Sequence, residues 1–293
     1  MHKQFNCIGL IGIPRQPTAL VTHQIIFNWL KENGYQVLVE EKLSEHLAFD
    51  VEHFASLEEI GKQAQLAIII GGDGNILRAA RFLSYYDIKM IGINRGNLGF
   101  LTDISPDNAI ENLSKVLSGD YIDDPRFLLE VSIYNKKGQN TASSFAVNEI
   151  VLHPSHVAHM IEYDAYINNR KAFSQRADGV IVATPTGSTA YSLSAGGPII
   201  TPQLDAIIIT PMFPHSLSAR PLVIKSNNVI KLKCPSAKEA LQITCDSQVI
   251  LNAEATDSII IKRSQNAFNL IHTANYNYFK NLSSKLGWSK KLY

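Results

Sequence analysis

Runs of apolar residues alternate with segments of helical periodicity along the first 120 residues. Continuous apolar runs at Phe5–Ile13, Leu66–Ile70 and Lys89–Ile93 are typical of strands buried on both faces of a parallel sheet. Apolar residues at helical spacing between these runs predict helices, for example at Ile76–Leu83. This order predicts an α/β domain with a parallel, Rossmann-like sheet over residues 1–120.

The pattern changes near residue 120, where short apolar segments separated by turn residues begin. Strands are predicted at Leu128–Tyr134, Phe145–Leu152, Ile161–Ile167, Gly179–Ala183, Ala206–Thr210, Val229–Lys233, Leu241–Cys245 and Ser258–Arg263. Many short strands with regular turns indicate an all-β, sandwich-like domain over residues 121–272. A last helix is predicted at Tyr276–Leu286, and we expect residues 273–293 to pack back on the first domain.

Composition narrows the class of protein. The chain has 293 residues, of which 45% are hydrophobic and 18% charged, as is usual for a globular protein. Its formal net charge of +1 gives no reason to expect nucleic acid or a membrane surface as partner. No apolar stretch approaches the roughly 20 residues that a membrane helix needs. Cys7, Cys234 and Cys245 form no C-x-x-C pair, which disfavours disulfides and zinc and favours a reducing, cytoplasmic location.

The first stretch with chemical potential is Gly71-Gly72-Asp73-Gly74-Asn75, between a predicted strand and a predicted helix. Ligands of parallel sheets bind beyond the carboxyl ends of strands, and helix N-termini favour anions. A carboxylate there suits a base, which typically accelerates transfer to a hydroxyl by about 10²–10⁴-fold. A tight turn with Asp73 as an N-cap is equally compatible with the local sequence. The stretch matches neither a Walker A loop nor the G-x-G-x-x-G fingerprint.

Three more polar stretches lie within or directly after predicted strands. Arg95 could contact phosphate oxygens, although a solvated arginine in a surface loop is favoured. Asn148 and Glu149 interrupt an apolar run and offer an amide and a carboxylate to ribose hydroxyls, but a solvent-facing strand edge is as compatible. Asp246–Gln248 is either a ligand loop or a hairpin turn.

The segment Thr184–Pro198 is rich in hydroxyls and glycines and contains one aromatic residue, Tyr191. Such a loop could surround an adenine and its ribose, with Tyr191 stacking on the base. A flexible Gly/Ser linker is less favoured, because Thr, Tyr and Leu are interleaved with the small residues. His153, His156 and His159 are spaced so that they would not converge in a strand and turn, which favours structural roles over a metal site.

Taken together, these stretches resemble the NAD kinase family. The matching segments are GGDGN (71–75), GINRGNLGFLTD (92–103), NE (148–149), VAHMIE (157–162), RADG (176–179), TPTGSTAYSLSAGGPI (184–199), MFPHSLSARPLVI (212–224) and CDSQ (245–248). They follow the family order over most of the chain. The TPTGSTAYSLSAGGP block is highly specific, whereas GGDG is shared with diacylglycerol kinases and phosphofructokinase-like enzymes.

The resemblance implies an enzyme that transfers the γ-phosphoryl group of ATP to the 2′-hydroxyl of the adenosine ribose of NAD, giving NADP and ADP. It implies Asp73 as the catalytic proton acceptor. The implied NAD-binding residues are Asp73, Gly74, Arg78, Asn148, Glu149, His159, Arg176, Asp178, Thr189, Ala190, Tyr191, Ser192, Leu193, Ser194 and Gln248. It also implies a divalent metal, expected to be Mg²⁺, that accompanies ATP without ligands from the protein, and a homodimer or homotetramer. The residues alone leave two rivals: a lipid or sugar kinase, and a non-catalytic dinucleotide sensor.

Overall fold

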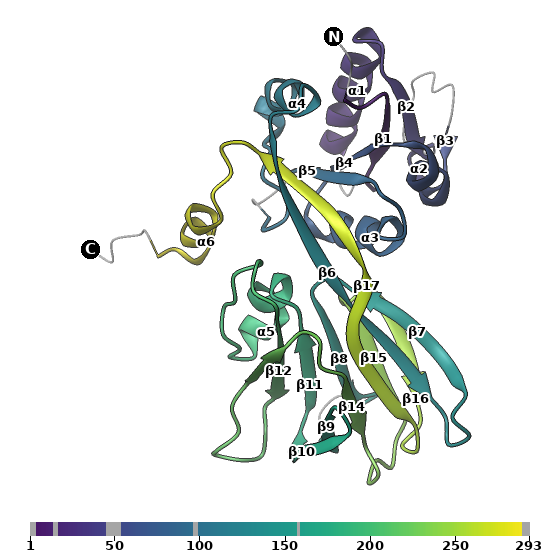
Figure 1. Ribbon diagram of the computed structural model, residues 1–293, viewed down its shortest axis with the longest axis vertical. Coiled ribbons are helices and arrows are strands. Elements are labelled where there is room, and N and C mark those ends of the chain that lie inside the picture. The colour runs from purple at the N-terminus through teal and green to yellow at the C-terminus, as the bar shows by residue number, and fades with distance from the viewer. Residues whose placement is uncertain (1–3, 14–16, 45–53, 96–98, 157–158, 289–293) are drawn as a thin grey trace. The chain divides into compact units, whose positions relative to one another are not determined.

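The structure is a computed structural model, shown in Figure 1. It describes residues 4–13, 17–44, 54–95, 99–156 and 159–288, with the backbone alone for residues 17–19. The chain divides into two compact units, the first comprising Met1–Pro125 with Phe268–Tyr293 and the second Arg126–Ala267. Strands β6 (Tyr121–Tyr134) and β17 (Ser258–Thr273) therefore each have residues in both units.

A parallel sheet forms the first unit, which confirms the predicted α/β fold. Its strand order is β5-β4-β1-β2-β3, and the end of β17 pairs parallel to β5 through Asn269 and Leu270. The strands are β1 (Cys7–Ile11), β2 (Gln36–Glu40), β3 (Phe54–Ala55), β4 (Leu66–Ile70) and β5 (Lys89–Ile93). The central strand β4 is buried at every residue, which explains its uninterrupted apolar sequence.

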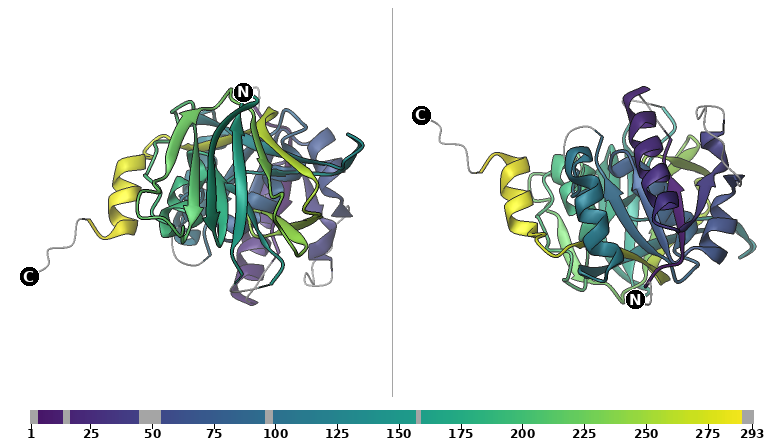
Figure 2. Two further views of the ribbon diagram at one scale, coloured as in Figure 1. Left: turned by 90° about the horizontal axis from the view of Figure 1, so that it is seen from below. Right: turned by 90° about the horizontal axis from the view of Figure 1, so that it is seen from above.

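Helices cover both faces of this sheet (Figure 2). They are α1 (Pro17–Glu32), α2 (Leu57–Gln63), α3 (Asp73–Leu83) and α4 (Ala109–Leu117). A further helix, α6 (Tyr278–Leu286), follows β17 in the C-terminal segment. Ile8 and Leu10 of β1 belong to the core beneath α1 and α4, whereas the intervening Gly9 faces Ile60 of α2. Successive residues of a strand point to opposite faces, so α1 with α4 and α2 with α3 lie on different sides of the sheet.

Antiparallel strands build the second unit, as predicted for the all-β part of the chain. One sheet runs β10-β9-β14-β17, with β6 pairing to β17 and β7, and the other runs β13-β12-β11-β8-β15-β16. Buried residues of both sheets, including Val131, Ile150, Tyr163 and Val182, form one shared core. The strands are β7 (Asn140–Ala146), β8 (Glu149–Pro154), β9 (Ile161–Ile167), β10 (Arg170–Ala177), β11 (Gly179–Ala183), β12 (Ala206–Met212), β13 (Leu222–Lys225), β14 (Ile230–Lys233), β15 (Leu241–Cys245) and β16 (Val249–Ala253).

Cys7, Cys234 and Cys245 are all buried with free thiols. Burial raises the pKa of Cys7, and it raises the pKa of Cys234 to about 12, so neither thiol is activated. In the described part of the chain, no helix combines the length and the apolar character needed to cross a bilayer.

Candidate active site

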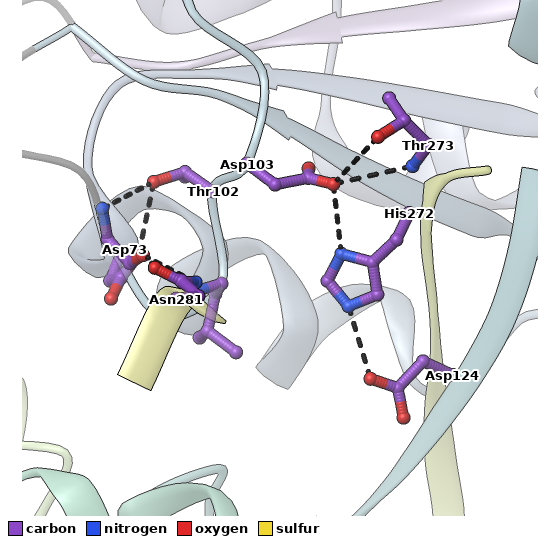
Figure 3. Close-up of polar contacts among 9 residues, drawn as sticks. Asp73, Thr102, Asp103, Asp124, His272, Thr273 and Asn281 are labelled. Atoms are coloured by element: carbon purple, nitrogen blue, oxygen red, sulfur yellow. Dashed lines mark hydrogen bonds and ion pairs between the residues drawn. The ribbon is translucent and has the colours of Figure 1, made fainter. Parts of the chain in front are cut away.

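Asp73 is the first residue of α3, and main-chain amides of a neighbouring loop hold its carboxylate (Figure 3). Oδ2 accepts a hydrogen bond from the Phe100 amide at 2.7 Å. Oδ1 accepts from the Leu101 amide at 3.1 Å and from the Thr102 hydroxyl at 3.3 Å. The N-cap of α3 is Gly72, so the alternative of Asp73 as a capping residue is wrong. The extended backbone of Gly72 also lets α3 start at Asp73, three residues before the predicted Ile76.

The residues Gly99–Asp103, here called loop 99–103, approach Asp73 closely because Gly99 has no side chain. A Cβ at this position would lie 1.7 Å from Asp73 Oδ1 and 2.4 Å from Thr102 Oγ1. The preceding residues 96–98 of the matching motif lie outside the described residues, and Arg95 before them is half-buried. Any side chain at position 99 would therefore displace the Asp73 carboxylate.

A lysine of the C-terminal helix adds positive charge near this carboxylate. Lys285 Nζ of α6 lies 4.0 Å from the centroid of the Phe100 ring. Burial lowers the pKa of Lys285, and the Asp73 charge acts in the opposite direction. Asp73 thus lies at a helix N-terminus with both amide donors and a cationic side chain around it.

Arg78, one turn further along α3, is engaged by a buried carboxylate. Its Nη1 and Nη2 donate to Glu40 Oε1 and Oε2 at 2.6 and 2.7 Å, and Glu40 is only 1% exposed. Glu40 Oε2 also accepts from the Gly12 amide at 3.2 Å. The structure therefore gives Arg78 an ion-pair role, and its contact with NAD stays a prediction, as does that of Gly74.

In the second unit, Asp246 organises the backbone that precedes β8. Its carboxylate accepts from the amides of Val147, Asn148 and Glu149 at 3.0, 2.7 and 3.2 Å. Asp246 has φ 51° in the turn between β15 and β16, so Asp246–Gln248 forms a hairpin turn, and the contact of Gln248 with NAD stays a prediction. Three amide donors to one buried carboxylate fix the direction in which Asn148 and Glu149 leave the backbone.

Glu149 is a buried acid with an unsatisfied oxygen. It is 4% exposed, and no other described residue offers a hydrogen bond to its Oε2. Burial and then the negative charge of Asp246 raise the pKa of Glu149 to about 8, although the Tyr191 amide acts to lower it. An unpaired buried polar atom is destabilising, so this position favours a ligand that supplies the missing hydrogen bond.

The segment that begins at Thr184 packs directly on the backbone of Val147 and Asn148. The Thr184 amide donates to the Asn148 carbonyl at 2.9 Å, and its hydroxyl donates to the Val147 carbonyl at 2.6 Å. The same hydroxyl accepts from the Gly187 amide at 3.1 Å. A Cβ on Gly187 would lie 2.1 Å from the Asn148 carbonyl oxygen, so only glycine allows this approach.

The predicted adenine loop contains a 3₁₀ turn (Thr186–Thr189) and a short helix, α5 (Tyr191–Ser194). Two of its hydroxyls serve the fold: Ser192 Oγ is buried 3.2 Å from Thr210 Oγ1, and Thr189 Oγ1 donates to the Thr186 carbonyl at 3.3 Å. The Tyr191 ring is 42% exposed. Ser194 is also exposed, whereas Ala190 and Leu193 are half-buried. The segment is thus an ordered structure and not a flexible linker.

Two cavities of the second unit share His159. The first, of about 650 Å³, contains Arg176 together with Lys238 and Glu239. The second, of about 610 Å³, contains Asp178 and Tyr191. The structure therefore brings His159 together with Arg176 on one side and with Asp178 and Tyr191 on the other.

His156 and His159 share Glu239, whose Oε2 and Oε1 lie 3.2 and 2.6 Å from their Nδ1 atoms. His153 Nδ1 instead contacts the Pro154 carbonyl at 2.8 Å. Within the described ranges, no three His, Cys, Asp or Glu side chains are grouped to hold a metal ion. Gln248 is exposed, and its amide donates to the Cys245 carbonyl at 3.0 Å.

Sequence reasoning missed the residues that support the site. Asp246 and Thr184 orient Asn148 and Glu149, while Thr102 and Lys285 surround Asp73. Asp246 and Thr184 lie inside segments that carry the resemblance, which was a usable signal. Lys285 lies outside those segments, and no pattern in the sequence indicated it.

Comparison with known proteins identifies kinases as the relatives of this chain. Residues 8–121 match the ATP-NAD kinase N-terminal domain and residues 147–273 the ATP-NAD kinase C-terminal domain. The NAD kinase of Pectobacterium atrosepticum is 57% identical over 100% of both chains. The NAD kinase of Yersinia pestis is 56% identical over 100% of this chain and 99% of its own.

Two solved structures are similar over nearly the whole chain. Yeast NADH kinase complexed with NADH has a TM-score of 0.88 at 25% identity, covering 98% of this chain and 89% of its own. An NAD kinase from Archaeoglobus fulgidus in complex with ATP has a TM-score of 0.72 at 25% identity, covering 96% and 98%. The parallel-sheet unit, the antiparallel unit and these neighbours place the chain among the phosphotransferases that act on pyridine dinucleotides. Both of its domain matches are to one such group, and the chain belongs to the ATP-NAD kinase family.

Proposed function

We propose that this chain phosphorylates NAD to NADP with ATP by moving the γ-phosphoryl group to the 2′-hydroxyl of the adenosine ribose, with Asp73 accepting the hydroxyl proton. ATP-dependent phosphorylation of NAD is the reaction of the family to which the chain belongs. The assignment of the proton acceptor rests on how the Asp73 carboxylate is held.

The two carboxylate oxygens of Asp73 differ in how many further hydrogen bonds they can accept. Each carboxylate oxygen has two lone pairs. Oδ1 accepts from both Leu101 and Thr102, whereas Oδ2 accepts from the Phe100 amide. Oδ2 thus keeps a lone pair with respect to these contacts, and we assign it as the atom that takes the proton.

Transfer would then proceed in line. The ribose O–H proton passes to Asp73 Oδ2 as the oxygen bonds to the γ-phosphorus, and the bond from that phosphorus to ADP breaks. The N-terminus of α3 favours the negative charge of the phosphates. Positioning and charge neutralisation supply most of the rate enhancement in phosphoryl transfer, and the base adds to it.

Most of the proposed contacts with the dinucleotide come from the second unit. We propose that Asn148 and Glu149 bind ribose hydroxyls, because both are fixed at the backbone and Glu149 Oε2 needs a donor. Gly74, Arg78, Gln248 and the loop Thr189–Ser194 are proposed as further contacts. His159, Arg176 and Asp178 are also proposed as NAD contacts, because they line the two cavities described above.

We further propose that ATP is used as its complex with a divalent metal, expected to be Mg²⁺, which neutralises charge on the transferred phosphoryl group. We also propose a cytoplasmic homodimer or homotetramer. Light scattering of the purified protein measures that oligomeric state directly.

Replacing Asp73 by asparagine tests the catalytic assignment. Asparagine keeps the shape but cannot accept a proton, so kcat for NADP formation should fall by about 10²-fold or more. NAD binding, measured by calorimetry, should stay near that of the unmodified chain. Asp87→Asn, at an acid in the same unit that follows α3, serves as the matched control and should retain activity. An Asp73→Asn enzyme with near-normal kcat would show that another group takes the proton.

A further inference from the structure

Residues of the C-terminal segment of the chain contact loop 99–103 at both ends of the loop (Figure 3). At the far end, Asp103 Oδ2 accepts from the Thr273 amide at 3.3 Å and lies 3.3 Å from His272 Nδ1. At the near end, the Asn281 side-chain amide lies 3.5 Å from the Gly99 carbonyl. The residues between these ends donate the hydrogen bonds to Asp73, so the C-terminal segment borders the loop that orients the proposed base.

His272 lies between two carboxylates, those of Asp103 and Asp124. Its side chain is fully buried, with Asp103 on the Nδ1 side and Asp124 3.1 Å from Nε2. The Tyr276 ring stacks on it with a centroid distance of 3.6 Å and an interplanar angle of 4°. The Nε2 contact is a hydrogen bond and the Nδ1 contact an ion pair with a second carboxylate, so both contacts are favourable together only when the ring carries a positive charge.

The environment of His272 supports the imidazolium form. Burial alone lowers the pKa of a histidine, but hydrogen bonding to Asp103 and Asp124 and the charges of both carboxylates outweigh it and raise the pKa of His272. The imidazolium joins the carboxylate of loop 99–103 to that of β6.

We propose that His272 is a positioning residue for phosphoryl transfer: its imidazolium, clamped between Asp103 and Asp124, holds loop 99–103 so that its amides aim Asp73 Oδ2 at the reacting hydroxyl. This inference rests on the proposed role of Asp73. It goes further by assigning a catalytic effect to a buried residue of β17 that need not touch either substrate. A purely structural His272 would affect stability but would leave kcat of the folded enzyme unchanged.

Two substitutions separate these roles, because they preserve different halves of the imidazole. The amide nitrogen of asparagine stands as many bonds from Cα as Nδ1 does, so His272→Asn keeps a donor toward Asp103. The amide nitrogen of glutamine corresponds to Nε2, so His272→Gln keeps a donor toward Asp124 and loses the link to the loop. Both remove the buried charge and should lower the Tm to a similar extent.

The proposal expects kcat to fall by about 10–100-fold in His272→Gln, the loss typical of a small misplacement of a catalytic group. His272→Asn should keep a kcat at least several-fold higher, with the KM values for NAD and ATP little changed in both. Ile26→Val, a core substitution on the buried side of α1, is the control for lost stability alone. Equal kcat values in the two His272 variants would overturn the proposal.

A second variant carries the test if His272→Gln does not fold. Asp103→Asn removes the negative charge of this link from the loop side while leaving the contact of His272 with Asp124. It should reproduce the loss of kcat with the KM values for NAD and ATP little changed. An Asp103→Asn enzyme with near-normal kcat would overturn the proposal.

Amide hydrogen exchange separates failure of this inference from failure of the proposed base. Breaking the clamp should speed exchange at Phe100 and Leu101, whatever residue takes the proton. Unchanged exchange in His272→Gln and Asp103→Asn refutes the inference even if Asp73 proves to be the base. Faster exchange together with a fully active Asp73→Asn enzyme refutes the base assignment and shows that His272 holds the loop without serving catalysis.

Discussion

Replacing Glu149 by glutamine is expected to stabilise the protein at alkaline pH while weakening NAD binding. Glu149 is buried with an unsatisfied oxygen, and its pKa rises from an ordinary 4.5 to about 8 in the folded chain. Between these values the folded chain keeps a proton that the unfolded chain releases. Stability contributed by this site therefore falls as pH rises from 4.5 and levels off above 8.

The size of the effect follows from that difference in pKa. At about 1.36 kcal/mol for each pH unit, ionising Glu149 in the folded chain costs about 5 kcal/mol at pH 9 relative to pH 4.5. Glutamine cannot ionise, so Glu149→Gln does not lose this free energy at high pH. The Tm of the variant should therefore be about 10 °C above that of the unmodified chain at pH 9. At pH 5 the two proteins should melt at similar temperatures.

Differential scanning calorimetry of both ligand-free proteins across pH 5 to 9 measures the effect. Glu254→Gln is the matched control, since Glu254 is an exposed acid of the same unit. That substitution should leave the pH profile unchanged. A difference between the unmodified chain and Glu149→Gln that stays constant with pH, or that favours the unmodified chain at pH 9, would refute the assignment of Glu149 as a buried acid.

Three other results are expected. If ribose hydroxyls donate to ionised Glu149, NAD binding near pH 7 should release up to one proton, and titration heats that do not vary with the ionisation enthalpy of the buffer would contradict this. Gly99→Ala should lower kcat by about 10²-fold with an intact circular dichroism spectrum, because the new Cβ displaces Asp73, and a normal kcat would show that the position of this carboxylate is not critical. Gly187→Ala should raise the KM for NAD several-fold, because its Cβ would push on the Asn148 carbonyl, and an unchanged KM would argue against Asn148 as a ligand.

The sequence predicted central strands well and edge strands poorly. Leu66–Ile70, Ile161–Ile167 and Leu241–Cys245 have the predicted bounds, since side chains buried in the core impose an apolar pattern. The strands that the pattern missed are β3, β7, β10, β13 and β16, and each lies at the edge of its sheet. Edge strands bury few side chains: β10 has one buried residue, so its sequence carries little hydrophobic signal.

The site was predicted in part for a related reason. Asp73 lies just after β4, and Asn148 and Glu149 lie at the start of β8, where they stand out as polar residues within apolar surroundings. Their supports come from distant parts of the chain: Asp246 lies 98 residues from Asn148, and Asn281 lies 182 residues from Gly99. Local periodicity carries no information about such contacts, so the clamp on loop 99–103 became visible only with the fold.

The return of β17 to the side of β5 sets an order of events during synthesis on the ribosome. Asp103 is made 170 residues before Thr273, its partner from the returning strand. At about 5–20 residues per second, Asp73 and loop 99–103 are synthesised roughly 10–30 s before the C-terminal segment that contacts this loop. The antiparallel unit is complete by residue 267, so it can fold first, and a chain truncated during translation would bear the aspartate without its clamp.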